Sequence, residues 1–326
     1  MVDFSVAIRT YNGAKRLPNI LAALKAQSLI DGTFNQGSFK WEILVVDNNS
    51  TDNPQAIIEQ FRLGWPEGLS KCSLRYVLEP KQGASFARRR ALLEAQGRWV
   101  GFLDDDNIPH VNWLAAAYRF GQAHPRAAAF GGQIHARYES PPPAHFDRIA
   151  SFMPVIERDE TICFTQGWRA MSNLVPPGAG LVVQRQVWLT HVPEVLTLKG
   201  PVGTSLAQKG EDTEALLHLK KAGWEIWFNP QMRIYHQISR HRFERDYLRR
   251  FFEGVGLSKY TTRMVACARW QRPLMTLLFL MSDIRKLLHH VITHGLCLDV
   301  VAACERQLIV SSLWSPFYTW KQWLCR

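Results

Sequence analysis

The N-terminal third of the chain repeats one pattern, in which a short apolar run is followed at once by a polar segment. The apolar runs occupy residues 4–8, 42–46, 74–78 and 99–103. Segments with the leucine, alanine and isoleucine spacing of amphipathic helices lie between them, at 14–28, 53–61 and 84–95. Strands that alternate with helices are typical of a parallel sheet with crossover helices. The pattern therefore predicts a βαβαβαβ unit of the α/β class.

The polar segments that end these runs contain the candidate ligands. They are Thr10-Tyr11-Asn12-Gly13, Asp47-Asn48-Asn49-Ser50, Lys81-Gln82-Gly83 and Asp104-Asp105-Asp106-Asn107. Open parallel sheets bind their ligands just beyond the carboxyl ends of the strands, which share one edge. We therefore predict that these side chains converge and that this edge of the sheet is the binding site.

Three adjacent acids, Asp104, Asp105 and Asp106, follow the fourth apolar run. Such carboxylates repel one another unless a cation or a proton neutralises them. Alternation along an extended chain puts Asp104 and Asp106 on the same side. Hard oxygen ligands of this kind suit Mg²⁺ or Mn²⁺ with its shell completed by diphosphate oxygens and water. The pattern predicts a metal site at Asp104 and Asp106, and Asp105 is the acid least expected to touch the metal. The alternative is that the acids only cap the next helix.

The remainder of the chain divides into an irregular part and a helical part. Strand-like pieces occur in the irregular part at 129–134, 180–184, 225–228 and 233–236. Gly210-Glu211-Asp212 opens a helical pattern that continues through Lys221, and from Phe243 onward the chain has helical patterns only. We therefore expect a catalytic domain over residues 1–240 and a helical C-terminal extension over residues 241–326.

The formal net charge of +11 predicts an anionic partner. A protein that binds nucleic acid gains nothing from acids clustered at its ligand edge, so no nucleic-acid partner is expected. A dinucleotide-dependent oxidoreductase would carry GxGxxG after the first strand, and a P-loop enzyme would carry GxxxxGK[ST]. Neither pattern occurs, so both classes fit poorly.

The C-terminal part interleaves basic and aromatic residues. The basic residues are Arg233, Arg240, Arg242, Arg245, Arg249 and Arg250, and the aromatic ones are Trp270, Trp314, Phe317, Tyr318, Trp320 and Trp323. The basic residues predict a contact with diphosphate, with a lipid-linked acceptor or with an anionic membrane surface, and a solvated helix face is the alternative. The aromatic residues predict a peripheral membrane contact, and a core or an oligomer contact is the alternative. The apolar stretch at 273–281 is too short to span a bilayer, and the N-terminus lacks the pattern of a signal peptide. The protein is expected in the cytoplasm or at the cytoplasmic face of the inner membrane.

The motifs together resemble those of family 2 glycosyltransferases with the GT-A fold, similar to the bacterial exopolysaccharide enzymes. The segments that carry the resemblance are 6–12, 43–52, 83–88, 102–107 and 210–212, and they extend over about the first 240 residues. The resemblance implies a Rossmann-like, mostly parallel central sheet flanked by helices, followed here by the helical extension.

The resemblance also implies roles for individual residues. A nucleotide-diphosphate sugar, with a UDP-sugar favoured, would contact Thr10, Tyr11, Asn12, Asp47, Gly83, Arg88, Asp104 and Asp105. The metal would be held by Asp104, Asp106 and His236, and Asp212 with Glu211 would supply the base that removes the proton of the acceptor hydroxyl.

Structural roles are the alternatives at several of these positions. Asp47 could instead close an Asx turn, Asp212 could stabilise a helix N-terminus, and His236 could be a structural histidine. The chain also departs from the family after Arg88, where Arg89 and Arg90 stand in place of the usual Asn. The arginine that faces the diphosphate is therefore open among the three.

The function implied by the resemblance is an inverting, metal-dependent transfer of a sugar to a glycan or lipid-linked acceptor in polysaccharide biosynthesis. The QxxRW motif of processive relatives is absent around Arg269-Trp270, which predicts a non-processive enzyme. One alternative is a sugar nucleotidyltransferase, which would carry a glycine-rich basic loop after the first strand. The other is a basic protein that binds nucleic acid or an anionic surface without catalysis. The oligomeric state is open.

Overall fold

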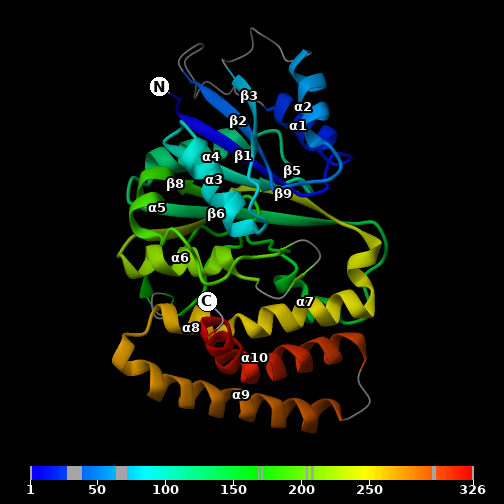
Figure 1. Ribbon diagram of the computed structural model, residues 1–326, viewed down its shortest axis with the longest axis vertical. Coiled ribbons are helices and arrows are strands. Elements are labelled where there is room, and N and C mark those ends of the chain that lie inside the picture. The colour runs from blue at the N-terminus through cyan, green and yellow to red at the C-terminus, as the bar shows by residue number, and fades with distance from the viewer. Residues whose placement is uncertain are drawn as a thin grey trace.

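The computed structural model describes residues 2–27, 39–63, 72–167, 169, 172–202, 205–206, 209–295 and 299–324. Within these residues the chain forms a nine-stranded sheet between two layers of helices, with a further group of helices beyond one of the layers (Figure 1). The predicted α/β class with a helical C-terminal extension is confirmed.

The first half of the sheet has the predicted βαβαβαβ order. Its strands are β1 (Phe4–Thr10), β2 (Trp41–Asp47), β3 (Cys72–Leu78) and β4 (Trp99–Asp104). They are connected by α1 (Leu17–Lys25), α2 (Pro54–Leu63) and α3 (Ala84–Glu94). The strands run parallel in the order β3-β2-β1-β4. The polar segments after β1, β2 and β4 therefore lie at one edge, as predicted.

The second half makes the central sheet mixed, because most of its strand pairs are antiparallel. Its elements are β5 (Asn107–Pro109), α4 (Trp113–Ala123), β6 (Ala127–Tyr138), β7 (Ile162–Cys163), β8 (Val182–Gln184), α5 (Arg185–His191), α6 (Glu211–Lys221) and β9 (Glu225–Ile238). The order continues β4-β8-β6-β9-β5, and β7 pairs with β9. Strand β8 is antiparallel to both β4 and β6, whereas β6 and β9 run parallel.

One predicted boundary in this half is wrong. The strand pieces expected at 225–228 and 233–236 are a single strand, β9. The register with β6 shifts between Gly132 and Gln133, so the segment with Pro230 is accommodated as an irregularity of the ladder. Gln133 Nε2 donates a hydrogen bond of 2.8 Å to the carbonyl of Pro230 at this point, which keeps the strand continuous although proline has no N–H to donate.

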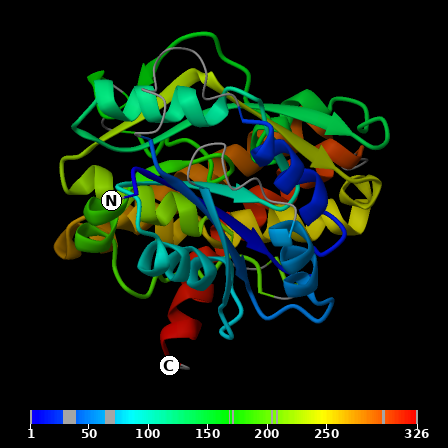
Figure 2. The same ribbon diagram turned by 90° about the horizontal axis from the view of Figure 1, so that it is seen from above.

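The sheet is buried on both faces because side chains alternate along each strand. Val6 and Ile8 of β1 lie in one apolar core, covered by α1, α2 and α4. Ala7 lies in the other core, covered by α3, α5 and α6. The view along the sheet shows helices on both sides of the strands (Figure 2). This three-layer packing holds the strand ends of the site rigidly.

Close packing over β4 makes Gly101 a sensitive position. A Cβ at Gly101 would lie 2.6 Å from Trp113 Cη2 and 3.0 Å from Phe4 Cε1. We expect Gly101→Ala to lower the free energy of unfolding by about 1–3 kcal/mol, as overpacking does elsewhere, and urea denaturation measures the change. Combining it with Trp113→Phe, which removes the clashing Cη2, should recover part of the loss. Equal stability of the single variant and the wild type would contradict the packing at this point.

The described part of the C-terminal extension consists of helices joined by short turns. It contains the 3₁₀ turn η4 (Arg240–Phe243) and the helices α7 (Arg245–Leu257), α8 (Lys259–Val265), α9 (Arg272–His294) and α10 (Val300–Leu324). No described helix has both the length and the apolar character needed to cross a membrane.

The helical extension shares a core with the preceding part of the chain. Phe146 and Ile149, which come before residue 240, pack in one cluster with Leu248, Phe252 and Val301. Figure 1 shows α7 lying between the α/β part and α9. The division at residue 240 stays a prediction, but the two parts are joined by this third core.

Candidate active site

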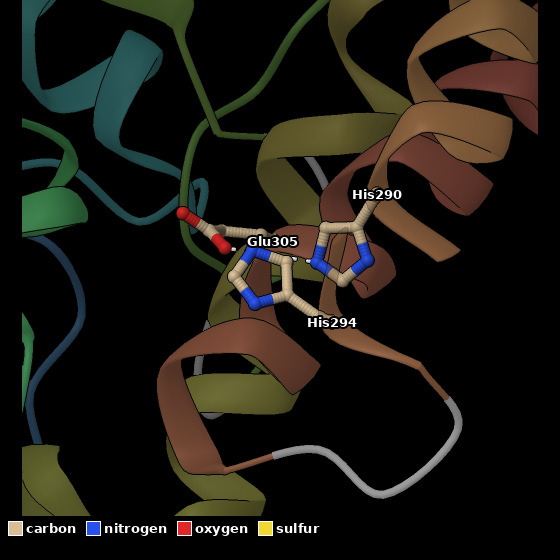
Figure 3. Close-up of side chains that lie close together, drawn as sticks. All are labelled: His290, His294 and Glu305. Atoms are coloured by element: carbon tan, nitrogen blue, oxygen red, sulfur yellow. Dashed lines mark ion pairs between the residues drawn. The ribbon is translucent and has the colours of Figure 1, made fainter. Parts of the chain in front are cut away.

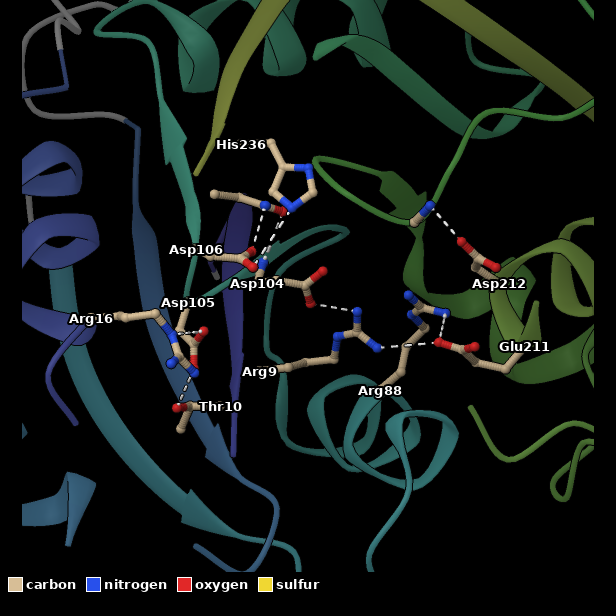
Figure 4. Close-up of polar contacts among 12 residues, drawn as sticks. Arg9, Thr10, Arg16, Arg88, Asp104, Asp105, Asp106, Glu211, Asp212 and His236 are labelled. Atoms are coloured by element: carbon tan, nitrogen blue, oxygen red, sulfur yellow. Dashed lines mark hydrogen bonds and ion pairs between the residues drawn. The ribbon is translucent and has the colours of Figure 1, made fainter. Parts of the chain in front are cut away.

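A pocket of about 580 Å³ opens at the predicted edge of the sheet. Its walls come from the ends of β1 and β4, the loop before β8, the N-terminus of α6, and helices α7 and α8. Eight of the predicted site residues line it: Thr10, Tyr11, Asp104, Asp105, Asp106, Glu211, Asp212 and His236. Figure 4 shows that these side chains, except Tyr11, come together from segments distant in the sequence.

Asp104 is held by an arginine on the neighbouring strand. Arg9 Nη2 donates to Asp104 Oδ1 at 2.5 Å, and Arg9 Nη1 lies 3.5 Å from Glu211 Oε1. Burial opposes the charged form of Arg9, but Asp104 and Glu211 outweigh it and raise the pKa of the guanidinium. The Asp104 side chain is still 37% exposed. It therefore presents a carboxylate to the pocket while its position is fixed.

Asp105 is engaged within the protein through both of its oxygens. Arg16 Nε and Nη2 donate to Oδ1 and Oδ2 at 2.7 and 3.0 Å, and Thr10 Oγ1 donates to Oδ2 at 2.7 Å. Burial raises the pKa of Asp105 although these hydrogen bonds act in the opposite direction. The contacts connect β4 to β1 and to the start of α1. Asp105 thus has the geometry of a positioning residue.

Asp106 and His236 face each other across a third arginine. Arg242 Nη2 lies 2.5 Å from Asp106 Oδ2, and Arg242 Nη1 lies 2.9 Å from His236 Nε2. His236 Nε2 and Asp106 Oδ2 are 3.7 Å apart. Burial alone would raise the pKa of Asp106, but His236 and Arg242 hold it well below its usual range. Asp106 is therefore an anion whose charge Arg242 neutralises.

The donor chemistry of this wall suits a hard divalent cation. Asp104 and Asp106 offer carboxylate oxygens of the kind that Mg²⁺ and Mn²⁺ prefer. The buried Nδ1 of His236 has no hydrogen-bond partner within the described residues. The guanidinium of Arg242 contacts Asp106 where a metal would otherwise neutralise it. A cation would therefore have to replace Arg242 on Asp106.

A different histidine cluster lies in the extension. His290 and His294 of α9 and Glu305 of α10 have donor atoms within 4.8 Å of one another, and no other such group occurs in the described part of the chain (Figure 3). Arg148 pairs with Glu305 and lies 2.9 Å from His294 Nε2. A fixed guanidinium thus already satisfies two members of the cluster, which connects η1 (Phe146–Arg148) to α9 and α10.

The N-terminus of α6 places Asp212 on the wall opposite Asp104. Asp212 Oδ2 accepts a hydrogen bond of 2.6 Å from the Gly178 N–H, and Oδ1 accepts one of 2.8 Å from the Thr213 N–H. A Cβ at Gly178 would lie 2.7 Å from Asp212 Oδ2 and 2.6 Å from Arg88 Nη2. A side chain at this position would have to displace the Asp212 carboxylate or the Arg88 guanidinium, so the glycine permits the close approach that orients Asp212.

Arg88 lies behind the pocket rather than in its lining. It is only 1% exposed, and its Nη1 is 3.7 Å from Glu211 Oε1. Burial, with the charge of Arg9, lowers its pKa. Arg89 and Arg90 point elsewhere, to Glu194 and Glu94. In this structure Arg88 supports the acids of α6 from behind the pocket, and its contact with the nucleotide stays a prediction.

Four cations that the sequence pattern did not single out line the pocket: Arg9, Arg16, Lys209 and Lys259. Arg9 was seen only as part of a strand motif, and Lys209 directly precedes Gly210-Glu211-Asp212. Burial lowers the pKa of Lys209 to about 8, helped by the charge of Arg242 and opposed by Glu211. The Lys209 ammonium lies 4.2 Å from the centre of the Phe251 ring. In the sequence, the position of Lys209 directly before Gly210-Glu211-Asp212 is the only feature that could have indicated its place in the pocket.

Three further predicted nucleotide contacts are Asn12, Asp47 and Gly83. None of them is among the described residues that line the pocket. Asp47 closes the Asx turn that was its alternative role, because Oδ1 accepts from the Ser50 N–H at 2.9 Å and Oδ2 accepts from the Tyr76 hydroxyl at 2.7 Å. Asn48, which does line the pocket, accepts from the Gly83 N–H at 2.8 Å. These bonds arrange the loop ends next to Tyr11.

Known proteins share both the sequence motifs and the fold. The glycosyltransferase AglE of Haloferax volcanii is 34% identical over 111 residues, which are 34% of this chain and 32% of AglE. The chain thus matches about a third of that relative's length. Mannosyltransferase PcManGT of Pyrobaculum calidifontis, solved with GDP-Man and Mn²⁺, has a TM-score of 0.56 and 16% identity over 96% of this chain and 87% of its own.

A second solved structure shows the same architecture. Residues 1–349 of Staphylococcus aureus TarS, solved with UDP-GlcNAc, give a TM-score of 0.51 and 16% identity over 97% of this chain and 92% of theirs. At such identity the likeness shows the fold alone, which is GT-A. The family model for glycosyl transferase family 2 matches residues 5–174, more than half of the 326 residues. The chain belongs to glycosyl transferase family 2.

Proposed function

We propose that this protein is an inverting, metal-dependent, non-processive glycosyltransferase that moves a sugar from a nucleotide-diphosphate sugar to a glycan or lipid-linked acceptor in polysaccharide biosynthesis. It would act in the cytoplasm or at the cytoplasmic face of the membrane. One observation carries the proposal: Asp104 and Asp106 lie on one wall of a single pocket whose opposite wall presents Asp212. A carboxylate pair and a separate base are the two parts that this chemistry needs.

The donor would bind at the strand ends. Its nucleoside would lie beside Thr10, Tyr11 and Asn48, with a UDP-sugar favoured. Its diphosphate would lie near Asp104 and Lys209, which line the same pocket. The names of the similar structures support a nucleotide sugar in general, because TarS was solved with UDP-GlcNAc and PcManGT with GDP-Man.

Asp104 and Asp106, with His236 beside them, would hold Mg²⁺ or Mn²⁺. A bound divalent cation neutralises the charge that develops on a leaving diphosphate. Arg242, once released from Asp106, would be a further cation for the phosphate oxygens, and a guanidinium suits them well. Arg9 keeps Asp104 in place throughout because it is also anchored by Glu211.

Asp212 would act as the base. It would take the proton of the acceptor hydroxyl while that oxygen bonds to the anomeric carbon and the bond from this carbon to the diphosphate breaks. The hydrogen bond from the Gly178 N–H orients the carboxylate. A base on the wall opposite the diphosphate site supports attack from the opposite face of the sugar, and hence inversion.

A donor screen tests the proposal. Thermal unfolding of the full chain is measured with UDP-, GDP- and dTDP-sugars, each with and without Mn²⁺. A ligand at a hundred times its Kd stabilises the folded state by about 2.7 kcal/mol, so one donor should raise the Tm only with Mn²⁺ present. Absence of any shift with every donor would contradict the proposal.

Lys209 predicts a pH dependence of donor affinity. Its folded-state pKa of about 8 lies below the ordinary 10.5. The Lys209 side chain is therefore positively charged below about pH 8 and loses this charge as the pH rises through that value. Donor affinity should therefore fall above about pH 8, and bound diphosphate should move this step upward by favouring the charged form. Titration calorimetry at a series of pH values measures the step. The Lys209→Met variant should bind the donor more weakly than the wild type below pH 8, and its donor affinity should not fall near pH 8. A fall that persists in this variant would show that a different group causes the pH dependence.

A further inference from the structure

A second pocket adjoins the active-site pocket on the side of the helical extension. It has a volume of about 320 Å³, and its lining residues are Asn173, Thr213, Lys259, Thr262, Arg263, Phe279, Ser282 and Lys286. Thr213, Lys259 and Thr262 line both pockets. Because Thr213 follows Asp212 directly, the second pocket leads from the proposed base, past α8, to α9.

Three cations surround this second pocket. No acid is among its described lining residues, which include Lys259, Arg263 and Lys286. The nearby Asp283 takes up one of the three positive charges: Arg263 pairs with it at 2.6 and 2.8 Å, and Lys286 Nζ lies 3.7 Å away. Burial and the charges of Arg263 and Lys286 lower the pKa of Lys259. The pocket therefore holds a positive potential that suits an anion with more than one charge.

The outer face of α9 beside this pocket is apolar. Its exposed residues include Leu274, Leu277, Leu278, Met281, Ile284, Leu288, Val291 and Ile292, with exposed fractions from 37% to 83%. Only Asp283 and His290 of this helix are buried. Figure 1 shows α9 on the outside of the molecule, beyond α7 and α10. An apolar stripe of this size beside basic residues is typical of a helix that lies in a membrane interface.

Several aromatic residues near α9 and on α10 are also exposed. Trp270 is 80% exposed before α9, and Trp314, Phe317 and Trp320 of α10 are 62%, 52% and 43% exposed. The side chain of Trp323, which was grouped with them, lies outside the described residues. Tryptophan and basic residues favour the boundary between apolar chains and head groups.

We propose that the second pocket binds the diphosphate of a lipid-linked acceptor whose isoprenoid chain lies in the membrane surface against α9. The inference rests on the proposed function and specifies its acceptor. Lys259, Arg263 and Lys286 would hold the diphosphate, and the acceptor sugar beyond it would enter the first pocket past Thr213 toward Asp212. The apolar stripe of α9 would meet the lipid chains, while the positive charge attracts the anionic surface.

Binding of farnesyl diphosphate tests the pocket. Titrations are made with the full chain in EDTA, which removes metal-dependent binding at the donor site, against farnesyl diphosphate, farnesol and inorganic diphosphate. Wild type should bind farnesyl diphosphate most tightly. Lys286→Ala should weaken this binding about tenfold, as loss of a charge-assisted contact does. Arg285→Ala removes the same charge from the next position of α9 without touching the pocket, and its affinity should change less than about twofold.

The outcomes separate the acceptor proposal from the proposed function. If Arg285→Ala lost as much affinity for farnesyl diphosphate as Lys286→Ala, the ligand would be attracted to the basic surface in general. That result would overturn the proposal that the second pocket binds the diphosphate. No binding of farnesyl diphosphate, with the donor-dependent rise in Tm intact, would overturn the acceptor site and leave the transferase proposal standing. Loss of the donor-dependent shift itself would instead count against the transferase proposal.

Vesicle binding tests the face of α9. The full chain should sediment with vesicles of phosphatidylcholine and phosphatidylglycerol more than with phosphatidylcholine alone, and Met281→Glu should reduce this binding. The apolar residues of α9 also recur every seven positions, as at Leu274, Met281 and Leu288, a spacing that suits pairing with a second helix. The full chain could instead self-associate without lipid, lose this self-association in Met281→Glu and fail to bind vesicles. That result would show that the apolar face of α9 contacts a second copy of the chain, and it would overturn the membrane role.

Discussion

Asp212→Asn is expected to reduce kcat by about 10²–10⁴-fold, which is the usual contribution of a general base, while the Kd of the donor stays near that of the wild type. The amide is nearly the same size as the carboxylate and its oxygen can still accept from the Gly178 N–H, but it cannot take a proton from the acceptor. Because the donor binds at the strand ends on the opposite wall, its affinity should not depend on this change. Turnover and donor affinity are measured separately, by a product assay and by calorimetry.

The alternative role of Asp212, stabilisation of the α6 N-terminus, makes a different prediction. Loss of a favourable charge at a helix N-terminus costs about 0.3–1 kcal/mol of stability, which urea denaturation measures. A stability loss with near-normal turnover would show that Asp212 only supports the helix. Asp246→Asn, at the first turn of α7, is the matched control, since it should have the small stability effect and leave turnover unchanged.

Asp104→Asn is expected to remove most of the advantage that Mn²⁺ gives to donor binding, with a loss of at least about tenfold in affinity, the scale of one lost metal or charge contact. Asp106→Ala should also weaken metal-dependent donor binding. It would in addition leave Arg242 and His236 without their buried carboxylate partner, so its stability should fall. Donor Kd with and without Mn²⁺ measures the first effect, and thermal unfolding the second.

Asp105→Asn is the internal control for these two variants. Asp105 contacts Arg16 and Thr10 through both oxygens, so its loss should lower stability while the ratio of donor affinities with and without Mn²⁺ stays the same. A drop in that ratio as large as in Asp104→Asn would contradict the assignment of Asp104 and Asp106 as the metal pair.

The strand pattern and its polar ends could be predicted because both depend on residues close in the sequence. The alternation of Val6, Ala7 and Ile8 determines which side chain enters which core, and parallel strands bring Asp104 next to Arg9 by register. The convergence of Asp104 and Asp212 in one pocket also followed from motif order and family resemblance. Their catalytic roles stay predictions.

Contacts that depend on distant segments could not be predicted in this way. Arg88 sits in the first turns of a helix whose pattern does not show which polar residue faces inward, and only the packing of α6 against α3 buries it. Arg242 was one of several arginines in a basic segment, and its pairing with Asp106 depends on how η4 folds back over β9. The single β9 required a register shift that no local pattern reveals.

The third core, which joins the α/β part to the helical extension, determines which segments could be exchanged between related enzymes in a chimera. Phe146 and Ile149 belong to the α/β part by position but pack with Leu248, Phe252 and Val301 of the extension, and Arg242 brings the extension into the pocket itself. A chimera that grafts another relative's C-terminal helices at residue 240 would therefore separate partners that fit each other. The portable unit is the helical extension together with the 146–153 segment, so acceptor preference would pass between relatives only when both pieces are transplanted together.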